Sequence, residues 1–261
     1  EFAGTLCRTT YGNSPHVEVR DFSRGHFRGP RAFRLKGLPE GCGWMDLSAD
    51  VAFGIYNENT VITGDQIQPD MAVMALREIG FRDNGISSAR KGIAMGFGPD
   101  CWGYPEPLKA IRKAATHSVL YDKFLATANG WSNGCVPLIK MYLIVHNSGG
   151  AIKAKFAEDI LFPRGLSSHL DNLWEPPEIM CQCAEWRGMT DEECYETWNG
   201  GQGVLVVISK DDVSKFGNLA SGFGIEARHA GEITQETAPI VTIESKFTGK
   251  TISWLAPVEL P

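Results

Sequence analysis

The spacing of apolar residues along this chain predicts several buried strands. Uninterrupted apolar runs near residues 71–77, 141–145 and 203–209 are bounded by turn residues, a pattern typical of strands. Upstream, DLSADVAFGI predicts a further strand, which a turn and a shorter strand follow. Three more strands are expected near the C-terminus, in IEARHAGEIT, IVTIES and TISWLA. The pattern therefore indicates a sizeable β-sheet.

Five segments between these strands predict helices. NGISSARKGIAMGF favours a helix that begins near Asn84, an acceptable N-cap residue, and SVLYDKFLATANGW favours a second. EPPEIMCQCAEWRG has prolines in its first turn and Gly188 past its end. TDEECYETW opens with Thr190 and Glu193 at capping-box spacing, and DDVSKFGNLASGFG completes the set. Because helices are mixed with adjacent strands, we expect an α+β (α/β) fold, a mixed β-sheet packed with helices.

Residues 1–44 show weak periodicity and are rich in Gly, Arg, Pro and Phe. Between residues 18 and 36, arginines alternate with phenylalanines, but glycines and a proline interrupt any helix that would carry the stripe. This stretch could bind phosphate or RNA or dock a partner, and we favour a solvated or partner-covered loop. We therefore divide the chain into an irregular, Arg/Phe-rich N-terminal arm or linker, 1–44, and a folded domain, 45–261.

Composition narrows the classes of protein. Apolar residues make up 43% and charged residues 21% of the 261 residues, ordinary values for a globular protein. A net charge of −6 argues against a nucleic-acid partner. No apolar run reaches the ~18 residues of a membrane span, and residues 1–12 lack a signal-peptide pattern. The seven cysteines show no CxxC spacing, so we expect reduced thiols, no metal site and a cytoplasmic protein with no membrane partner.

Three glycine-containing turns carry the candidate chemistry. Each follows or precedes a predicted strand, where glycine permits a positive φ and close approach of backbone N–H groups to an anion. A histidine at such a turn is able to handle protons near neutral pH. Each turn also has a structural explanation, namely ordinary Asn-Gly turn chemistry, a histidine that caps a strand, or a glycine that ends a helix. The candidates are Asn84 and Gly85 in the first turn, His146, Ser148, Gly149 and Gly150 in the second, and Asn199 and Gly201 in the third.

These turns belong to an ordered series of segments. DLSADVAFGI, PDMAVMAL, RDNGISSAR, VHNSGGA, FPRGL, WEPPEIM and EECYETWNGGQGV follow one another along the chain, and FGIEARHAGEIT comes after them. The series resembles the C-terminal half of the AIR synthase family, the phosphoribosylformylglycinamidine cyclo-ligases. There the corresponding motifs include H-S-N-G-Y-S-L-V-R, A-H-I-T-G-G-G and W-x-x-P-x-I-F. The resemblance covers about residues 45–254 and implies an AIR synthase C-terminal-domain-like fold.

The chain also departs from the family. Arg82 and Asp83 stand where the family has the histidine and serine of H-S-N-G, and Ala151 replaces the third glycine of A-H-I-T-G-G-G. The family's N-terminal half, which carries the aspartates that hold Mg²⁺ and ATP, has no counterpart. EFAGT at residues 1–5 resembles the tail of the family's G-G-E-T-A segment. We therefore expect a chain that was cut or that works with a separate ATP-binding half.

The resemblance implies ATP-dependent ring closure of formylglycinamidine ribonucleotide to aminoimidazole ribonucleotide, with ATP and Mg²⁺ bound by the other half. It implies that His146 lies beside the substrate or the transferred phosphate and that Asn199 binds substrate or braces its loop. One alternative is a non-catalytic scaffold or assembly subunit that kept the fold. Another is a different ATP-using relative, such as the FGAM synthetase, selenophosphate synthetase or thiamine-phosphate kinase branches. An exposed sheet edge without its other half would favour oligomers.

Overall fold

A computed structural model describes most of the chain beyond residue 60. The described residues all belong to the unit Asn57–Pro261. They are 61–82, 85–101, 104–130, 134, 136–148 and 150–257. The N-terminal arm, the boundary predicted at residue 44 and the strand predicted in DLSADVAFGI lie outside the described residues.

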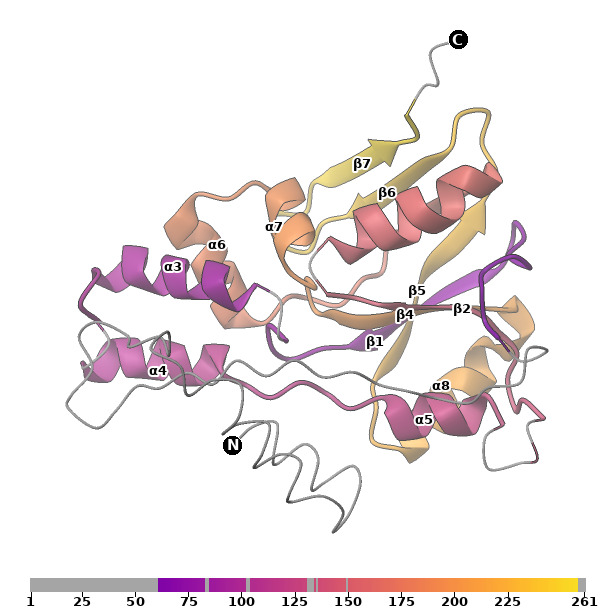
Figure 1. Cartoon of the computed structure of the whole chain (residues 1–261), viewed down its shortest axis with the longest axis horizontal. Coiled ribbons are helices and arrows are strands. Elements are labelled where there is room, and N and C mark those ends of the chain that lie inside the picture. The colour runs from indigo at the N-terminus through magenta and orange to yellow at the C-terminus, as the bar shows by residue number, and fades with distance from the viewer. Residues whose placement is uncertain are drawn as a thin grey trace, which may run out of the picture. The chain divides into compact units, whose positions relative to one another are not determined.

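The centre of the fold is a seven-stranded sheet in the order β2-β4-β1-β5-β3-β6-β7 (Figure 1). Within it, β3 and β6 pair in parallel, and the other neighbouring strands pair antiparallel. The predicted mixed sheet is therefore confirmed. The strands are β1 (Ala72–Arg77), β2 (Met141–His146), β3 (Ser167–Leu170), β4 (Gln202–Ile208), β5 (Ala227–Thr234), β6 (Ile240–Glu244) and β7 (Thr251–Leu255).

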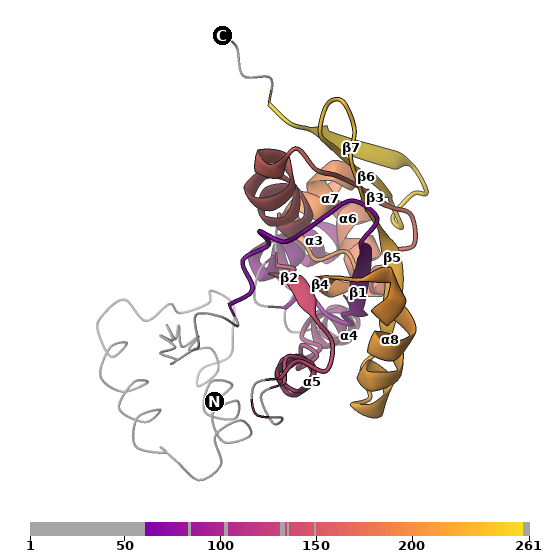
Figure 2. The same ribbon diagram turned by 90° about the vertical axis from the view of Figure 1, so that its right-hand side faces the viewer.

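Helices cover both faces of the sheet, and a separate helical group lies beyond the ends of β1 and β2 (Figures 1 and 2). The π-helix η3 packs on one face, α5 and α8 pack on the other, and α3, α4 and α6 share a third cluster. The helices are α3 (Ile86–Phe97), α4 (Pro105–Ala114), α5 (Asp122–Ala128), η3 (Ala151–Leu161), α6 (Glu178–Arg187), α7 (Asp191–Thr197) and α8 (Val213–Gly222), with short 3-10 turns η4 (Phe162–Arg164) and η5 (Lys210–Asp212).

Burial on both faces explains the unbroken apolar runs. Successive side chains of a strand point to opposite faces, so a strand covered on both sides needs apolar residues at every position. In β1, Val73 and Ala75 join the cluster that includes Phe156 of η3. Met74 and Leu76 join the opposite cluster, with α5 and α8. These core residues are almost fully buried, so the two layers fix the position and direction of β1.

Most predicted elements are confirmed, with corrected bounds. The helix expected in SVLYDKFLATANGW forms only over Asp122–Ala128. The capping box of α7 is present, because Thr190 Oγ1 accepts from the backbone N–H of Glu193 at 3.2 Å and Glu193 Oε2 accepts from that of Thr190 at 2.9 Å. Gly188 ends α6 with a φ of 62°.

The apolar pattern did not predict α4, η3 or β3. Strand β3 has the sequence SSHL, which shows no apolar pattern. Its buried serines are satisfied by hydrogen bonds instead, since Ser167 Oγ accepts from the Ile240 N–H at 3.0 Å and Ser168 Oγ donates to the Glu232 carbonyl at 2.8 Å. Polar strands of this kind are invisible to a search for apolar runs.

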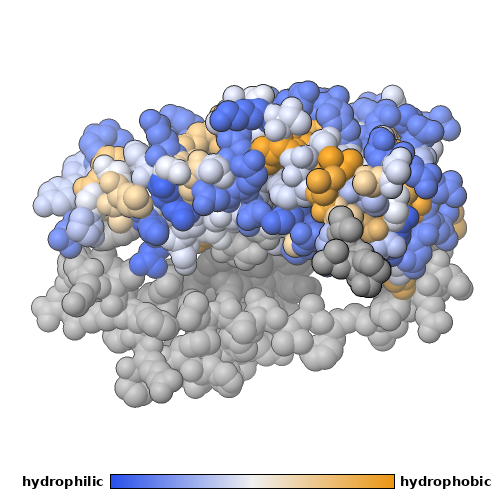
Figure 3. All heavy atoms as spheres, turned by 90° about the horizontal axis from the view of Figure 1, so that it is seen from above, coloured by the Kyte–Doolittle hydropathy of each residue, from blue (hydrophilic) through white to orange (hydrophobic). Residues whose placement is uncertain are grey.

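The surface seen from above is mainly hydrophilic. Small hydrophobic spots interrupt it without merging into one broad apolar area on this face (Figure 3). None of the helices in the described part of the chain has the length and apolar character needed to cross a bilayer.

Candidate functional site

Strand directions bring the three predicted turns to one edge of the sheet. β4 runs antiparallel to both β1 and β2, so the ends of β1 and β2 flank the start of β4. In this register His146 lies opposite Val204 and Arg77 opposite Gln202. We call this region the three-turn junction. It comprises Glu78–Arg82 and Gly85 after β1, Asn147, Ser148 and Gly150 after β2, and Trp198–Gly201 before β4.

Asn199 ties the three turns together. Its side chain is buried, with 1% exposure. Its Nδ2 donates to the carbonyl of Gly80 at 2.8 Å, and its Oδ1 accepts from the N–H of Gly201 at 2.8 Å. Its own carbonyl accepts from Asn147 Nδ2 at 3.1 Å. Because donor and acceptor are both used inside the protein, Asn199 braces the junction.

A buried carboxylate that sequence reasoning missed organises the turn after β1. Glu78 is 1% exposed, and its Oε2 lies 2.6 Å from Arg82 Nη1. Its Oε1 accepts from the N–H groups of Ile79 at 2.9 Å, Gly80 at 3.3 Å and Val119 at 3.3 Å. A buried charge is tolerated only when it is paired and hydrogen-bonded, as here. Arg82, which stands at the position of a family histidine, is thus engaged by Glu78.

Tyr121 completes this network. Its hydroxyl donates to the carbonyl of Arg77 at 2.6 Å and lies 3.4 Å from Glu78 Oε2. Burial, reinforced by the negative charge of Glu78, raises the pKa of Tyr121 well above its ordinary value of 10.0. Arg82 itself has a φ of 60°, uncommon for a residue other than glycine. The turn is therefore held in an unusual conformation by buried polar contacts.

Two of the candidate glycines are required by the protein's own packing. Gly85 has a φ of 84°, and a Cβ added there would collide with the indole of Trp198. Gly201 has a φ of 94°, and a Cβ there would lie 2.5 Å from the carbonyl oxygen of Glu175. At Gly150, with a φ of 71°, the corresponding neighbour is the Glu196 carbonyl oxygen, at 3.5 Å. Of these three turn glycines, Gly150 therefore has the most open surroundings.

The turn after β2 holds the candidate histidine. His146 is the last residue of β2 and is exposed, whereas Ser148 is buried. Lys155, on η3, reaches back over this turn: its Nζ donates to Ser148 Oγ at 2.8 Å and to the His146 carbonyl at 3.3 Å. Asn84 and Gly149 lie outside the described residues. The junction therefore brings His146, Ser148, Gly150, Asn199, Gly85 and Gly201 to one edge.

Trp174, in the WEPP segment, is clamped beside the junction. Gln202 makes two bonds to its backbone, donating to the Trp174 carbonyl at 2.9 Å and accepting from the Trp174 N–H at 2.8 Å. The indole Nε1 donates to the Ala75 carbonyl at 3.0 Å, and the Arg228 guanidinium lies 3.8 Å from the ring centre. The matched motifs WEPPEIM and EECYETWNGGQGV contain both residues, but their sequences do not predict that Gln202 holds Trp174.

The metal and thiol chemistry of the described residues is limited. They contain no group of three or more His, Cys, Asp or Glu side chains arranged to hold a metal ion. Burial raises the pKa of the Cys183 thiol to about 11 and that of Cys194 to about 12. Since the thiolate is the nucleophile, neither thiol is prepared for nucleophilic catalysis at neutral pH.

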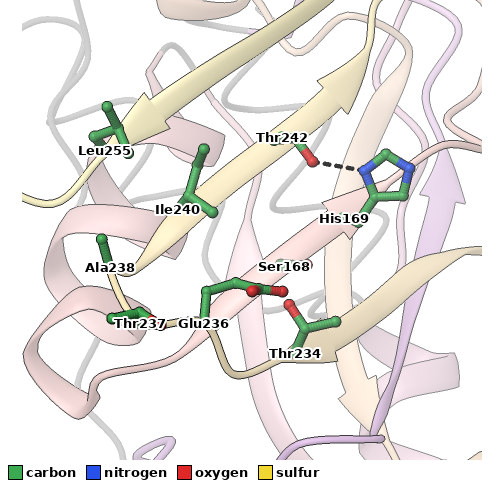
Figure 4. Close-up of a pocket in the computed structure, with 9 residues that line it drawn as sticks. All are labelled: Ser168, His169, Thr234, Glu236, Thr237, Ala238, Ile240, Thr242 and Leu255. Carbon is green, nitrogen blue, oxygen red and sulfur yellow. Dashed lines mark hydrogen bonds between the residues drawn. The ribbon is translucent and has the colours of Figure 1, made fainter.

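A surface hollow of about 480 Å³ lies elsewhere, among β3, β5, β6 and β7 (Figure 4). His169 Nδ1 lies 2.6 Å from Thr242 Oγ1 within it. Glu232, near the hollow's end of β5, pairs with Ala72 at the start of β1, whereas the three-turn junction follows the end of β1. The hollow and the junction therefore lie at opposite ends of the strands. The residues that line the hollow are Ser168, His169, Thr234, Glu236, Thr237, Ala238, Ile240, Thr242 and Leu255.

Sequence comparison finds phosphoribosylformylglycinamidine cyclo-ligases as relatives of this chain, among them three from different organisms. That of Desulfotalea psychrophila is 26% identical over 80% of this chain and 56% of its own length. That of Methylobacillus flagellatus is 28% identical over 75% and 54%. That of Methanococcus vannielii is 23% identical over 82% and 57%. The chain thus spans about half the length of the curated relatives that it matches. No protein-family model matches the chain.

Structure comparison gives distant neighbours. Thermotoga maritima PurL complexed with FGAR aligns with a TM-score of 0.44 and 12% identity, over 77% of this chain and 29% of that one. Escherichia coli HypE, a hydrogenase maturation protein, aligns with a TM-score of 0.45 and 10% identity, over 75% and 52%.

Proposed function

From the premise that this chain is a relative of the phosphoribosylformylglycinamidine cyclo-ligases, as its motifs predicted, we propose that it is the C-terminal portion of an enzyme of that kind. The proposed reaction is the ATP-dependent closure of formylglycinamidine ribonucleotide to aminoimidazole ribonucleotide, in purine biosynthesis. The observation that carries the proposal is the convergence of the three family-like turns, with His146 exposed at their edge.

The proposed chemistry divides between binding and proton transfer. The formyl oxygen of the substrate is phosphorylated, a substrate nitrogen attacks the same carbon, and phosphate leaves. Such a reaction needs a preorganised anion-binding backbone and a group that handles a proton beside the reacting oxygen. In our proposal the turn at Ser148–Gly150 supplies the backbone and His146 handles the proton. Asn199, braced by Gly80 and Gly201, fixes the position of the turn.

We propose that ATP and Mg²⁺ are bound by a second half of the enzyme. The described residues offer no group suited to Mg²⁺, so its ligands would come from an ATP-binding N-terminal half, on the same polypeptide or on a partner chain. ATP supplies the phosphoryl group when it is bound there. We propose an oligomer, because β2 and β7 each leave one edge of the sheet without a partner strand in the described part of the chain. A cytoplasmic location remains part of the proposal, on the expectation of reduced cysteines.

The first experiment asks whether that half exists. The protein is purified from its natural source, and its intact mass and any co-purifying chain are determined by mass spectrometry, beside the gene sequence upstream of Glu1. We expect an aspartate-rich ATP-binding segment in one of these places. If none is found on this polypeptide or on a co-purifying one, the enzymatic proposal is rejected.

The second experiment tests His146 in that complete assembly. With formylglycinamidine ribonucleotide, ATP and Mg²⁺, we expect His146→Ala to lower turnover by about 10²-fold or more, because general acid–base groups contribute on that order. His169→Ala is the matched control, since His169 is also exposed but lies in the hollow. Turnover of the His146 variant equal to that of the His169 variant would remove the proposed role.

A scaffold or assembly subunit is the second candidate function. It is favoured by Arg82, which stands at the position of a family histidine and whose guanidinium is engaged by Glu78 at 2.6 Å. A scaffold predicts a stable complex with a partner but no cyclisation, with or without His146. The turnover assay on the complete assembly separates the two functions.

A further inference from the structure

Among the residues that the structure describes, the ammonium group of Lys155 lies over the β2–η3 turn and pairs with no carboxylate. Lys155 is half-buried, and its Nζ lies 2.8 Å from Ser148 Oγ and 3.3 Å from the His146 carbonyl. An ammonium group has three N–H donors, and these contacts use two of them. Within the described part of the chain, Lys155 joins no ion pair closer than 4.0 Å. Within that part of the chain, no carboxylate is in direct contact with its positive charge.

Lys153, two residues earlier on the same helix, shows the contrast. Its Nζ lies 2.6 Å from Glu196 Oε1, and this pairing raises the pKa of Lys153. Lys153 thus connects η3 to α7 as an ordinary, partly exposed ion pair. Lys155 turns to neutral oxygens of the turn instead, where Gly150 leaves the backbone comparatively open. The two lysines lie on the same helix, but Lys153 pairs with a carboxylate whereas Lys155 contacts neutral oxygens.

We propose that Lys155 is a further ligand-binding residue, which holds a phosphate oxygen of a phosphorylated ligand at the β2–η3 turn together with the hydroxyl of Ser148. A lysine ammonium binds phosphate as a point charge, and its attraction for an anion grows when it is partly removed from water. The inference deepens the proposed function and rests on it, because it names the anion-binding group of the same site. The ligand chemistry is either the phosphate monoester of a ribonucleotide or the polyphosphate of ATP.

Binding measurements on the full 261-residue chain distinguish these sources. Isothermal titration calorimetry with ribose 5-phosphate probes a monoester, and titration with inorganic pyrophosphate probes a polyphosphate. We expect wild type to bind one of them, and Lys155→Met to weaken that binding at least about 10-fold, a loss of roughly 1.4 kcal/mol. Lys155→Arg should bind within about 3-fold of wild type because it keeps the charge. Lys153→Met is the matched control and should bind within about 2-fold.

The outcomes separate this inference from the proposed enzyme. Circular dichroism and thermal unfolding establish that each variant is folded, and Lys155→Gln replaces Lys155→Met if the latter is not. The inference is wrong if wild type binds neither probe at millimolar concentration, or if folded, uncharged variants bind as wild type does. Phosphate binding that depends on Lys155, in an assembly without cyclisation activity, would retain the binding site and reject the cyclo-ligase function. Turnover that is unaffected by Lys155→Met would retain the cyclo-ligase function and reject the role of Lys155 in ligand binding.

Discussion

The three-turn junction and the surface hollow occupy opposite ends of the same strands and differ in how their polar groups are held. In the junction, buried side chains of Glu78 and Asn199 are bonded to backbone groups from separate turns. In the hollow, the one hydrogen bond drawn between lining side chains joins His169 to Thr242 (Figure 4). The hollow has the volume of a ligand site, whereas the junction has the fixed geometry of one.

This difference indicates that the fixed positions of polar groups, more than the volume of a cavity, identify the candidate site in this fold. A reacting group must be held within a fraction of an ångström, which requires supporting contacts that are themselves fixed. The junction supplies such contacts around His146, while Glu236 and Thr237 of the hollow are exposed to solvent. Substitutions in the junction should therefore cost more folding stability than substitutions in the hollow.

Replacing Glu78 should have the largest effect. Glu78→Ala leaves Arg82 without its carboxylate and leaves the N–H groups of Ile79, Gly80 and Val119 without their acceptor. Breaking a buried ion pair on one side costs about 3–5 kcal/mol, and we expect a loss of that size in urea unfolding. Glu236→Ala, in the hollow, should change stability by less than about 0.5 kcal/mol. Equal losses in the two variants would erase the contrast between the regions.

Adding a methyl group at Gly85 should have the next largest effect. Gly85→Ala places a Cβ against the Trp198 indole at a residue whose φ is 84°, so we expect a loss of about 1–3 kcal/mol. Gly217→Ala is the control, because Gly217 lies within α8 and an added Cβ there meets no atom within 4 Å. That variant should gain up to about 1 kcal/mol, since alanine favours helix. A neutral Gly85→Ala variant would mean that the contact with Trp198 is not tight.

Alkaline pH should weaken the junction through Tyr121. Its pKa is raised in the folded state by burial and by Glu78, so the folded protein keeps a proton that the unfolded chain releases above pH 10.0. This contribution is complete below pH 10.0 and is lost as pH rises, by at most about 1.4 kcal/mol per pH unit. Urea unfolding at pH 9, 10 and 11 measures the slope. Tyr121→Phe should reduce it, and an unchanged slope would assign the alkaline loss to other groups.

Local sequence rules predicted the parts of this fold that depend on neighbours along the chain. The apolar runs of β1, β2 and β4, the capping box at Thr190 and the glycine that ends α6 can each be recognised within a few consecutive residues. The ordered motifs also located the three turns. Their convergence, however, depends on β4 lying between β1 and β2, which is a property of the sheet order.

Several contacts that hold the junction were beyond sequence reasoning because their partners are distant in the chain. Asn199 and the carbonyl that it binds at Gly80 are 119 positions apart. Glu78 follows an apolar run as an ordinary polar residue would, and only the fold buries it against Arg82 and Val119. Lys155 lies in η3, a helix that the apolar pattern did not reveal. The sequence therefore shows which polar residues are present, but it does not predict which of them pair with one another.

Removing the hollow's hydrogen bond should have the smallest effect. Thr242→Val keeps the shape of the side chain but removes the hydroxyl that lies 2.6 Å from His169 Nδ1. Because His169 is exposed, water replaces the lost partner, and we expect unfolding free energy to change by no more than about 0.5 kcal/mol. The β-branched side chain also suits strand β6. A loss above about 2 kcal/mol would show that the hollow is held as firmly as the junction, and fixed surroundings would then no longer distinguish His146 from His169.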